Sequence, residues 1–176
     1  MSALGYTLPE LEKFLHVQMR NIGQAALLQA GKFFHGRSLS HTVSYCRAWK
    51  KWFMPTTKEC YYNAAYFALE HQVLGVKYAE GYWLDPEAST FLYHAWNVLA
   101  DGRVIDFTQE AADHHLEREP NLECLYFGIT IPTDYLRKQI IHTGAARNYA
   151  GQYLAERSGR DTRIERNRKQ ETKNKR

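Results

Sequence analysis

Apolar residues near the N-terminus recur at helical spacing. Leu11, Leu15, Met19 and Ile22 are separated by three or four positions, so they lie on one face of a helix. The Thr and Glu of the segment TLPE have the spacing of a capping box, which marks a helix start. These features predict an amphipathic helix over about residues 7–31.

Three further segments have the composition of helices. The segment 40–53 is rich in aromatic residues and Lys, and Pro55 marks its end. The segment 56–75 opens with another T-x-x-E spacing and continues through an alanine-rich stretch that favours a buried helix. A final helix is predicted over 133–156, with a Thr as its first cap.

Between the third and fourth helices the hydrophobic period changes. Short β-branched and aromatic runs, separated by turn residues, predict four strands over 76–83, 91–99, 103–108 and 124–131. The order is therefore helices, then strands close enough in sequence to pair antiparallel, then a helix. This order predicts an α+β fold with an antiparallel sheet of about four strands.

Length and charge divide the chain into a body and a tail. At 176 residues, one domain with a substantial core is expected. The segment 157–176 carries nine Lys and Arg against three Asp and Glu, which leaves 14 basic and 16 acidic residues for 1–156. The tail has one Ile and no aromatic residue, so it buries too little to offset its ordering entropy. We expect a catalytic or binding domain over 1–156 and a flexible basic tail over 157–176.

The cysteines and the N-terminus predict a cytoplasmic setting. Cys46, Cys60 and Cys124 are an odd count without a CxxC pair, which argues against a disulfide framework and a zinc knuckle. The N-terminal segment lacks the basic and apolar regions of a secretion signal. No apolar stretch approaches the length of a membrane span, so no membrane contact is expected.

Three residues of different chemistry occur in the order that a thiol enzyme requires. Cys60 falls in the first turn of its predicted helix, where backbone N–H groups and the helix dipole favour the thiolate. His94 and Asp106 lie in two runs that are otherwise apolar, and a polar group inside a strand needs a partner. The three residue types are a nucleophile, a base and a group that orients the base.

Strand register decides whether His94 and Asp106 can meet. A two-residue Asp101-Gly102 turn would place them on opposite faces of the hairpin. A three-residue loop with a left-handed Gly102 instead sets Asp106 opposite Trp96, on the His94 face and one diagonal step away. The triad hypothesis therefore requires the longer loop, and that register puts Asn97 on the other face.

These segments resemble a known family. The residues ECYYNAAYFAL, GVKYAEGYW and YHAWNVLADGRVIDFT, within 59–108, resemble the core of the transglutaminase-like branch of the papain-like cysteine enzymes. That family places a Cys at a helix start, a His-Ala-Trp strand next, and an Asp near the end of the following strand. It includes transglutaminases, peptidases, amide-cleaving deglycosylases and non-catalytic relatives. The resemblance implies a papain/transglutaminase-like core with Cys60, His94 and Asp106 as the catalytic triad.

On this interpretation the chain is a cysteine hydrolase or acyltransferase acting on a protein, peptide or small amide. Cys60 attacks the acyl carbon, and water or an amine then resolves the thioester, so hydrolysis and transamidation both stay open. We expect no cofactor and no metal. Further assignments are these: Trp96, Tyr62 and Trp83 line the substrate site, and the Cys60 backbone N–H forms the oxyanion hole, with Trp52 or a Gln on an earlier helix as the second donor.

Other interpretations are weighed against this one. Glu59 stands where many members of the family have Gly, and a carboxylate there opposes thiolate formation if it points inward. The adjacent His114 and His115 are expected to be a solvated surface pair rather than metal ligands. The alternative to an enzyme is a catalytically silent binding module that uses its basic tail to dock on nucleic acid or an acidic partner.

Overall fold

The computed structural model describes residues 25–85 and 90–159, together with residues 10, 13, 15 and 17. Residues 10, 13, 15 and 17 are helical and Leu15 is buried in the core, as predicted for the N-terminal helix. The capping box at residue 7 and the tail beyond residue 159 lie outside the described residues. The last described helix, 150–159, runs through the predicted domain boundary at residue 156.

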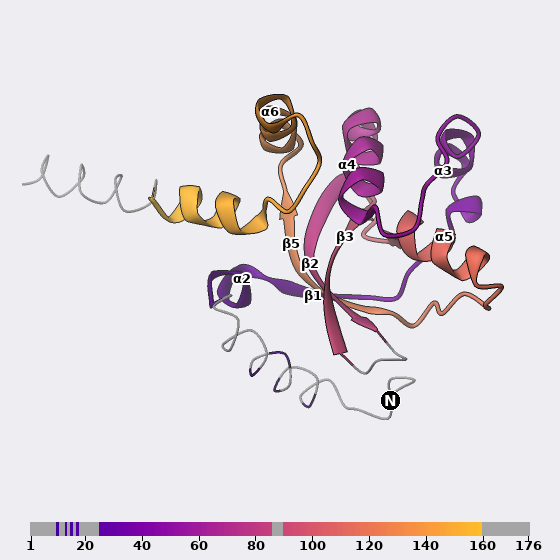
Figure 1. The fold of residues 1–176 in the computed structure, drawn as a ribbon, viewed down its shortest axis with the longest axis horizontal. Helices are drawn as coiled ribbons and strands as arrows, with labels where there is room; N and C mark the ends of the chain where they lie inside the picture. The colour runs from indigo at the N-terminus through magenta and orange to yellow at the C-terminus, as the bar shows by residue number, and fades with distance from the viewer. Residues whose placement is uncertain are drawn as a thin grey trace, which may run out of the picture.

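A five-stranded antiparallel sheet forms the centre of the molecule and curls into a half-barrel (Figure 1). Its strand order is β1-β5-β2-β3-β4. The four predicted strands are present, and the fifth, β1, pairs with β5 at the edge of the sheet. Sequence patterning missed β1 because it has only four residues. The strands are β1 (Lys32–His35), β2 (Lys77–Asp85), β3 (Thr90–Val98), β4 (Val104–Ile105) and β5 (Leu125–Ile131).

Helices cover the sheet and its edges. Helix α4 packs on β2 and β3, and it also contacts α5 and α6 (Figure 1). The α+β fold class is therefore confirmed, although α5 separates β4 from β5 and β1 lies among the first helices. None of the helices in the described part of the chain has the length and apolarity needed to cross a bilayer. The named α-helices are α2 (Ala25–Ala30), α3 (Ser44–Trp49), α4 (Cys60–Glu70), α5 (Phe107–His115) and α6 (Thr133–Thr143).

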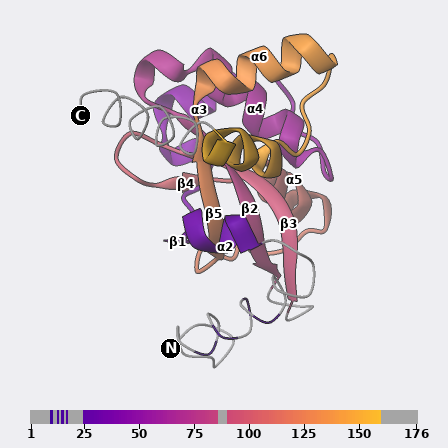
Figure 2. The same ribbon diagram turned by 90° about the vertical axis from the view of Figure 1, so that its left-hand side faces the viewer.

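Two helix boundaries differ from the prediction. Helix α4 begins at Cys60 rather than at Thr56, and its cap residue Glu59 makes no side-chain capping bond. The predicted helix over 133–156 is broken, because α6 ends at a left-handed Gly144 and a new helix starts at residue 150 (Figure 2). Gly144 fits this stop because glycine adopts the left-handed conformation without steric cost.

Helix α5 was not predicted. The sequence predicted a strand over 103–108, but β4 stops at Ile105 and Asp106 caps a nine-residue helix. The side chain of Asp106 accepts a hydrogen bond from the Gln109 backbone N–H, which is the usual role of an N-cap carboxylate. The cap therefore ends the strand at Ile105, three residues before its predicted end.

The two faces of the sheet bury different sets of side chains. One face packs on α4 and includes Tyr78, Tyr82 and Ala95, which belong to the larger core. The opposite face holds a smaller aromatic core around Trp83, Trp96 and Tyr126. At the centre of the sheet, Gly81 of β2 pairs directly with Gly128 of β5. A Cβ at Gly81 would lie 2.1 Å from the Phe127 carbonyl oxygen, so only glycine permits this approach.

Candidate active site

The hairpin between β3 and β4 has the longer of the two loops considered from sequence. Asn97 pairs with Ile105 and Val98 with Val104, and Gly102 is left-handed with a φ of 88°. The side chain of Asn97 points to the α4 face, where it donates to the Ala64 carbonyl. Because side chains alternate along a strand, His94 lies on the opposite face, as predicted.

His94 and Asp106 are in direct contact on that face. The imidazole Nε2 lies 2.7 Å from the Asp106 Oδ2. Both residues are buried, with exposed fractions of 8% and 2%. The other carboxylate oxygen, Oδ1, caps α5, and Tyr126 of β5 donates its hydroxyl to Oδ2 at 3.0 Å. Asp106 is therefore fixed from three directions and holds the ring through Nε2.

Asp106 and His94 each stabilise the charged form of the other. Burial alone would lower the pKa of His94, but the Asp106 charge and hydrogen bond, with a contribution from Cys60, raise that pKa to about 10. Burial alone would raise the pKa of Asp106, but the His94 charge and hydrogen bond, the Gln109 N–H and the charge of Arg37 hold it below its usual value. The pair is thus an imidazolium and a carboxylate at neutral pH.

Cys60 completes the group of three. It is the first residue of α4, so its backbone N–H belongs to the helix turn that has no acceptor within the helix. Cys60 lies close enough to the His94 ring to contribute to the raised pKa of the imidazole. Since Nε2 is engaged by Asp106, Nδ1 is the ring nitrogen left for the sulfur. The structure therefore brings Cys60, His94 and Asp106 together in the predicted order.

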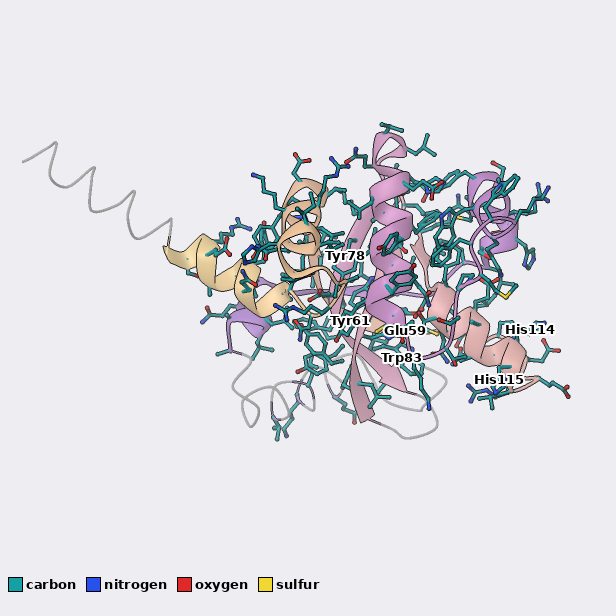
Figure 3. All side chains as sticks on the ribbon, turned by 45° about the horizontal axis from the view of Figure 1, so that its top comes forward. Glu59, Tyr61, Tyr78, Trp83, His114 and His115 are labelled. Carbon is teal, nitrogen blue, oxygen red and sulfur yellow. The ribbon has the colours of Figure 1, made fainter. Side chains whose placement is uncertain are left out.

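The turn before Cys60 keeps Glu59 away from the site. Lys58 has a φ of 66°, a left-handed conformation that residues with a side chain rarely adopt. Glu59 is exposed at the N-terminal end of α4 (Figure 3). Its carboxylate therefore faces solvent rather than the interior.

An amide one turn along α4 fixes the Cys60 turn and was missed from the sequence. Asn63 is buried, and its Nδ2 donates to the Thr56 carbonyl at 2.8 Å and to the Thr108 hydroxyl at 2.7 Å. These bonds connect α4, which begins at Cys60, with α5, which is capped by Asp106. The signal for this role was a polar amide on the buried face of a helix, three positions after the cysteine.

Tyr126 was also missed as part of the site. It is fully buried on β5, opposite Trp83 in the register, and its hydroxyl reaches Asp106. Its predicted strand was correct, but the pairing of β5 with β2 joins segments distant in sequence. No local pattern indicates which strand lies beside β2.

The aromatic residues assigned to substrate contacts take different positions. Trp83 is 8% exposed, with its ring centroid 5.9 Å from that of His94, so it shields the imidazole. Trp96 has no exposed surface and packs edge-to-face on Phe34, which makes it a core residue and corrects its assignment to substrate binding. The alternation of side chains along the strand predicted which face of the sheet Trp96 lies on, but not how deeply Trp96 is buried.

The other two assignments lie on the outer surface. Tyr62 follows Cys60 by two positions, which turns it to the outer side of α4, where it stacks on Phe53. Trp52 is 92% exposed after α3, so its indole is not placed as a second oxyanion donor. The Cys60 N–H is the one predicted donor that the fold positions.

A second buried carboxylate lies on the opposite face of the sheet. Glu80 of β2 is fully buried and accepts hydrogen bonds from the Tyr78 hydroxyl at 2.5 Å and from the Tyr149 and Ala150 backbone N–H groups. It thereby caps the 150–159 helix. Burial, only partly offset by these donors, raises the pKa of Glu80 to about 7. The sequence analysis did not identify Glu80.

The histidine pair lies away from these residues. His114 and His115 are exposed at the C-terminal end of α5, and Figure 3 shows both at the far end of that helix. Within the described residues, no group of three or more His, Cys, Asp or Glu side chains is arranged to hold a metal ion.

The remaining two cysteines differ from Cys60. Both are buried, and burial raises the pKa of Cys46 to about 12 and also raises that of Cys124. No imidazole of the described residues contributes to the pKa of either cysteine. Comparison of the chain with protein-family models, with curated proteins and with solved structures finds no match, so the chemistry of the site is inferred from its own geometry.

Proposed function

We propose that this protein is a cysteine-dependent acyl-transfer enzyme with a transglutaminase-like triad of Cys60, His94 and Asp106. The observation that carries the proposal is that the Asp106 carboxylate holds His94 Nε2 while Cys60, at the start of α4, contributes to the raised pKa of the same ring. A thiol at a helix start, an imidazole and an orienting carboxylate are the parts of a thiol acyl-transfer site.

The charge state of His94 suits the first half of the reaction. With its pKa raised, the imidazole is protonated at neutral pH. An imidazolium beside a cysteine favours the nucleophilic form of the thiol. The sulfur attacks the carbonyl carbon of an amide, and the Cys60 N–H can donate to the developing oxyanion. The C–N bond then breaks, the imidazolium gives its proton to the leaving amine, and a thioester remains on Cys60.

The second half of the reaction reverses the proton transfer. Neutral His94 takes a proton from water or from an amine, which attacks the thioester carbon. The C–S bond breaks and the thiolate–imidazolium pair is restored. Water as the acceptor gives hydrolysis, and an amine gives transamidation. Asp106 holds the ring orientation throughout and stabilises its charged form.

Thiol labelling tests the proposal on the intact chain. Iodoacetamide at pH 6, followed by mass spectrometry of each cysteine peptide, should modify Cys60 about ten-fold faster than Cys46 or Cys124. The substitution His94→Ala should remove most of this advantage, because no imidazolium then stabilises the thiolate. Cys46 and Cys124 are internal controls. Equal labelling of all three cysteines, unchanged by His94→Ala, would contradict the proposal.

Trapping distinguishes a reactive thiol from an acyl-transfer enzyme. Incubation with a glutamine- and asparagine-containing peptide library and hydroxylamine should give peptide hydroxamates, because hydroxylamine attacks an enzyme thioester. Wild-type protein should form them and Cys60→Ser should not. Products without hydroxylamine then separate the two acceptors, since free acid indicates water and crosslinked peptide indicates an amine.

A further inference from the structure

Tyr126 lies beside both members of the His94–Asp106 pair. Its hydroxyl donates to Asp106 Oδ2 at 3.0 Å, and the same oxygen lies 2.7 Å from His94 Nε2. Its ring lies alongside the imidazole, with the two centroids 6.4 Å apart and the planes inclined by 26°. Burial and the neighbouring Asp106 charge raise the pKa of Tyr126 well above its usual value, so the hydroxyl stays protonated at neutral pH. Tyr126 is therefore a neutral donor to the oxygen that orients His94.

The second half of the proposed reaction changes the charge beside Asp106. In the thioester stage, His94 has given its Nδ1 proton to the leaving amine, so the ring is neutral. Asp106 then no longer has a cation in direct contact. The described groups that still donate to it are all neutral, and they are His94 Nε2–H, the Tyr126 hydroxyl and the Gln109 backbone N–H.

The one ring proton that remains in this stage must stay on His94 Nε2. If Asp106 takes up a proton, its carboxyl group donates to Nε2, and the ring proton then lies on Nδ1. Nδ1 could not accept a proton from the attacking water or amine in that state. Glu80 shows how a buried carboxyl group behaves with neutral donors: one hydroxyl and two N–H groups donate to it, and burial still raises its pKa to about 7. Each donor to Asp106 therefore matters once His94 is neutral.

The other described groups that interact electrostatically with Asp106 keep their charge near neutral pH. Besides His94 and Tyr126, these groups are Arg37 and Cys124. Arg37 lowers the pKa of Asp106, but it is itself paired with a carboxylate of α5. Burial raises the pKa of the Cys124 thiol, so that thiol is neutral. The Tyr126 hydroxyl is therefore the side-chain donor that supports the carboxylate when the imidazolium charge is lost.

We propose that Tyr126 is a positioning residue for the second half of the acyl transfer, because its hydroxyl keeps Asp106 anionic while His94 is neutral and so leaves Nδ1 free to accept a proton. The inference rests on the proposed function and goes beyond it by assigning Tyr126 to one half of the reaction. In the first half the imidazolium itself holds Asp106, so the hydroxyl contributes less there. Tyr126→Phe should therefore form a thioester at nearly the normal rate and resolve it slowly.

The two halves can be timed on the full chain with p-nitrophenyl acetate. The Cys60 sulfur displaces p-nitrophenolate, and water then displaces the sulfur and releases acetate. Absorbance of p-nitrophenolate follows the first step, and mass spectrometry of the Cys60 peptide follows the second. For Tyr126→Phe we expect acetylation within about two-fold of wild type and an acetyl-Cys60 that persists about ten-fold longer at pH 7, because a hydrogen bond to a carboxylate is lost. The delay should shrink as the pH rises, since alkaline pH restores the anionic carboxylate.

Tyr78→Phe is the matched control. It removes the hydroxyl that donates to Glu80, the buried carboxyl group on the opposite face of the sheet. Its acetyl-Cys60 should be resolved at the wild-type rate, whereas a general loss of stability would slow both variants. Equal persistence of acetyl-Cys60 in wild type and Tyr126→Phe, an equal delay in Tyr78→Phe, or a delay unchanged at alkaline pH would overturn the role of Tyr126. Acetylation that is not selective for Cys60 and is unaffected by His94→Ala would instead overturn the proposed function itself.

Discussion

Two carboxylates are buried on opposite faces of the same sheet, Asp106 on the His94 face and Glu80 on the α4 face. Each caps a helix, and each accepts a tyrosine hydroxyl, from Tyr126 and Tyr78 respectively. The difference is the cation: Asp106 contacts an imidazolium, whereas the donors that reach Glu80 from the described residues are all neutral. The pKa of Asp106 is lowered and that of Glu80 is raised to about 7.

The comparison separates the effect of hydrogen bonds on the pKa of a buried carboxyl group from the effect of an adjacent cation. Hydrogen bonds from a hydroxyl and from helix N–H groups lower a buried carboxyl pKa, but around Glu80 they do not overcome the loss of hydration. For Asp106, the adjacent imidazolium does overcome the loss of hydration. A permanently charged carboxylate suits a residue that orients an imidazolium, and a carboxyl that titrates near neutrality suits a structural cap whose strength varies with pH.

The largest expected effect is the loss of the charged pair. Asp106→Ala removes the partner of a buried imidazolium and also the cap of α5, so we expect the free energy of unfolding to fall by about 3–5 kcal/mol at pH 7. Asp106→Asn keeps a capping oxygen and should cost less. Urea unfolding of the three proteins measures this. Equal losses for Ala and Asn would show that the charge contributes nothing beyond the cap.

The stabilisation from His94 also predicts a pH window. Its folded pKa of about 10 lies above the ordinary value of 6.5, so this contribution is complete below pH 6.5 and is lost as the pH rises toward 10. The stability difference between wild type and Asp106→Asn should therefore shrink between pH 7 and pH 10. A difference that stays constant over this range would contradict the raised pKa.

The next effect is the pH dependence that Glu80 contributes. Its folded pKa of about 7 lies above its ordinary value of 4.5, so the native state binds more protons between these values. The stability contribution is therefore lost as the pH rises from 4.5 to 7, by about 3 kcal/mol at 1.36 kcal/mol per pKa unit. Wild type minus Glu80→Gln, measured by urea unfolding at pH 5 and pH 8, isolates this change. The same difference at both pH values would place the Glu80 pKa outside this window.

A smaller effect comes from the paired tyrosines. At pH 5 the Tyr126 hydroxyl donates to a charged carboxylate and the Tyr78 hydroxyl to a largely protonated one. We therefore expect Tyr126→Phe to cost about 2 kcal/mol and Tyr78→Phe about 1 kcal/mol. At pH 8, where Glu80 is ionised, the two losses should converge. Thermal unfolding of both variants at both pH values tests this, and a larger loss for Tyr78→Phe at pH 5 would reverse the comparison.

The smallest expected effect is at Gly102. Its left-handed conformation sets the register of the β3–β4 hairpin, which positions Asp106 and does not involve Glu80. Its φ of 88° is unfavourable for a residue with a Cβ, although a Cβ there would meet no atom within 4 Å. Gly102→Ala should therefore cost about 1 kcal/mol through backbone strain. The Glu80 titration, followed by carboxyl-carbon NMR, should not move. A shifted Glu80 titration would show that the two faces are coupled.

Local sequence patterns predicted the features that depend on neighbours in the chain. The length of one loop sets the register of the β3–β4 hairpin, and the longer loop places Asp106 on the His94 face. The pairing of Asn97 with Ile105 confirms this register. Helix α5 was also within reach, because Asp106 and Gln109 have capping-box spacing. The β-branched residues before Asp106 do form β4, but the predicted strand was extended past Asp106 to residue 108, where the cap starts a helix.

The remaining features depend on distant contacts. Glu80 meets the backbone of residues 149 and 150, and β1 meets β5, so neither partner is visible in a local window. The burial of Trp96 and the exposure of Trp52 depend on how layers pack, which periodicity does not report. For residues near the site, the sequence therefore predicted the face of the sheet correctly and the depth of burial incorrectly.

The facing pair Gly81 and Gly128 restricts how this chain can diverge. A Cβ at Gly128 would lie 2.1 Å from the Glu80 carbonyl oxygen, just as one at Gly81 would meet Phe127, so a change at one glycine cannot be compensated at the other. Both strands carry groups described above, because Gly81 follows Glu80 on β2 and Gly128 follows Tyr126 by two positions on β5. Gly81 also pairs with His94 of β3. Any homologue that keeps this sheet must retain glycine at both positions, even where its other residues have changed. The two glycines, together with the Cys, His and Asp, therefore form a signature by which distant relatives can be recognised.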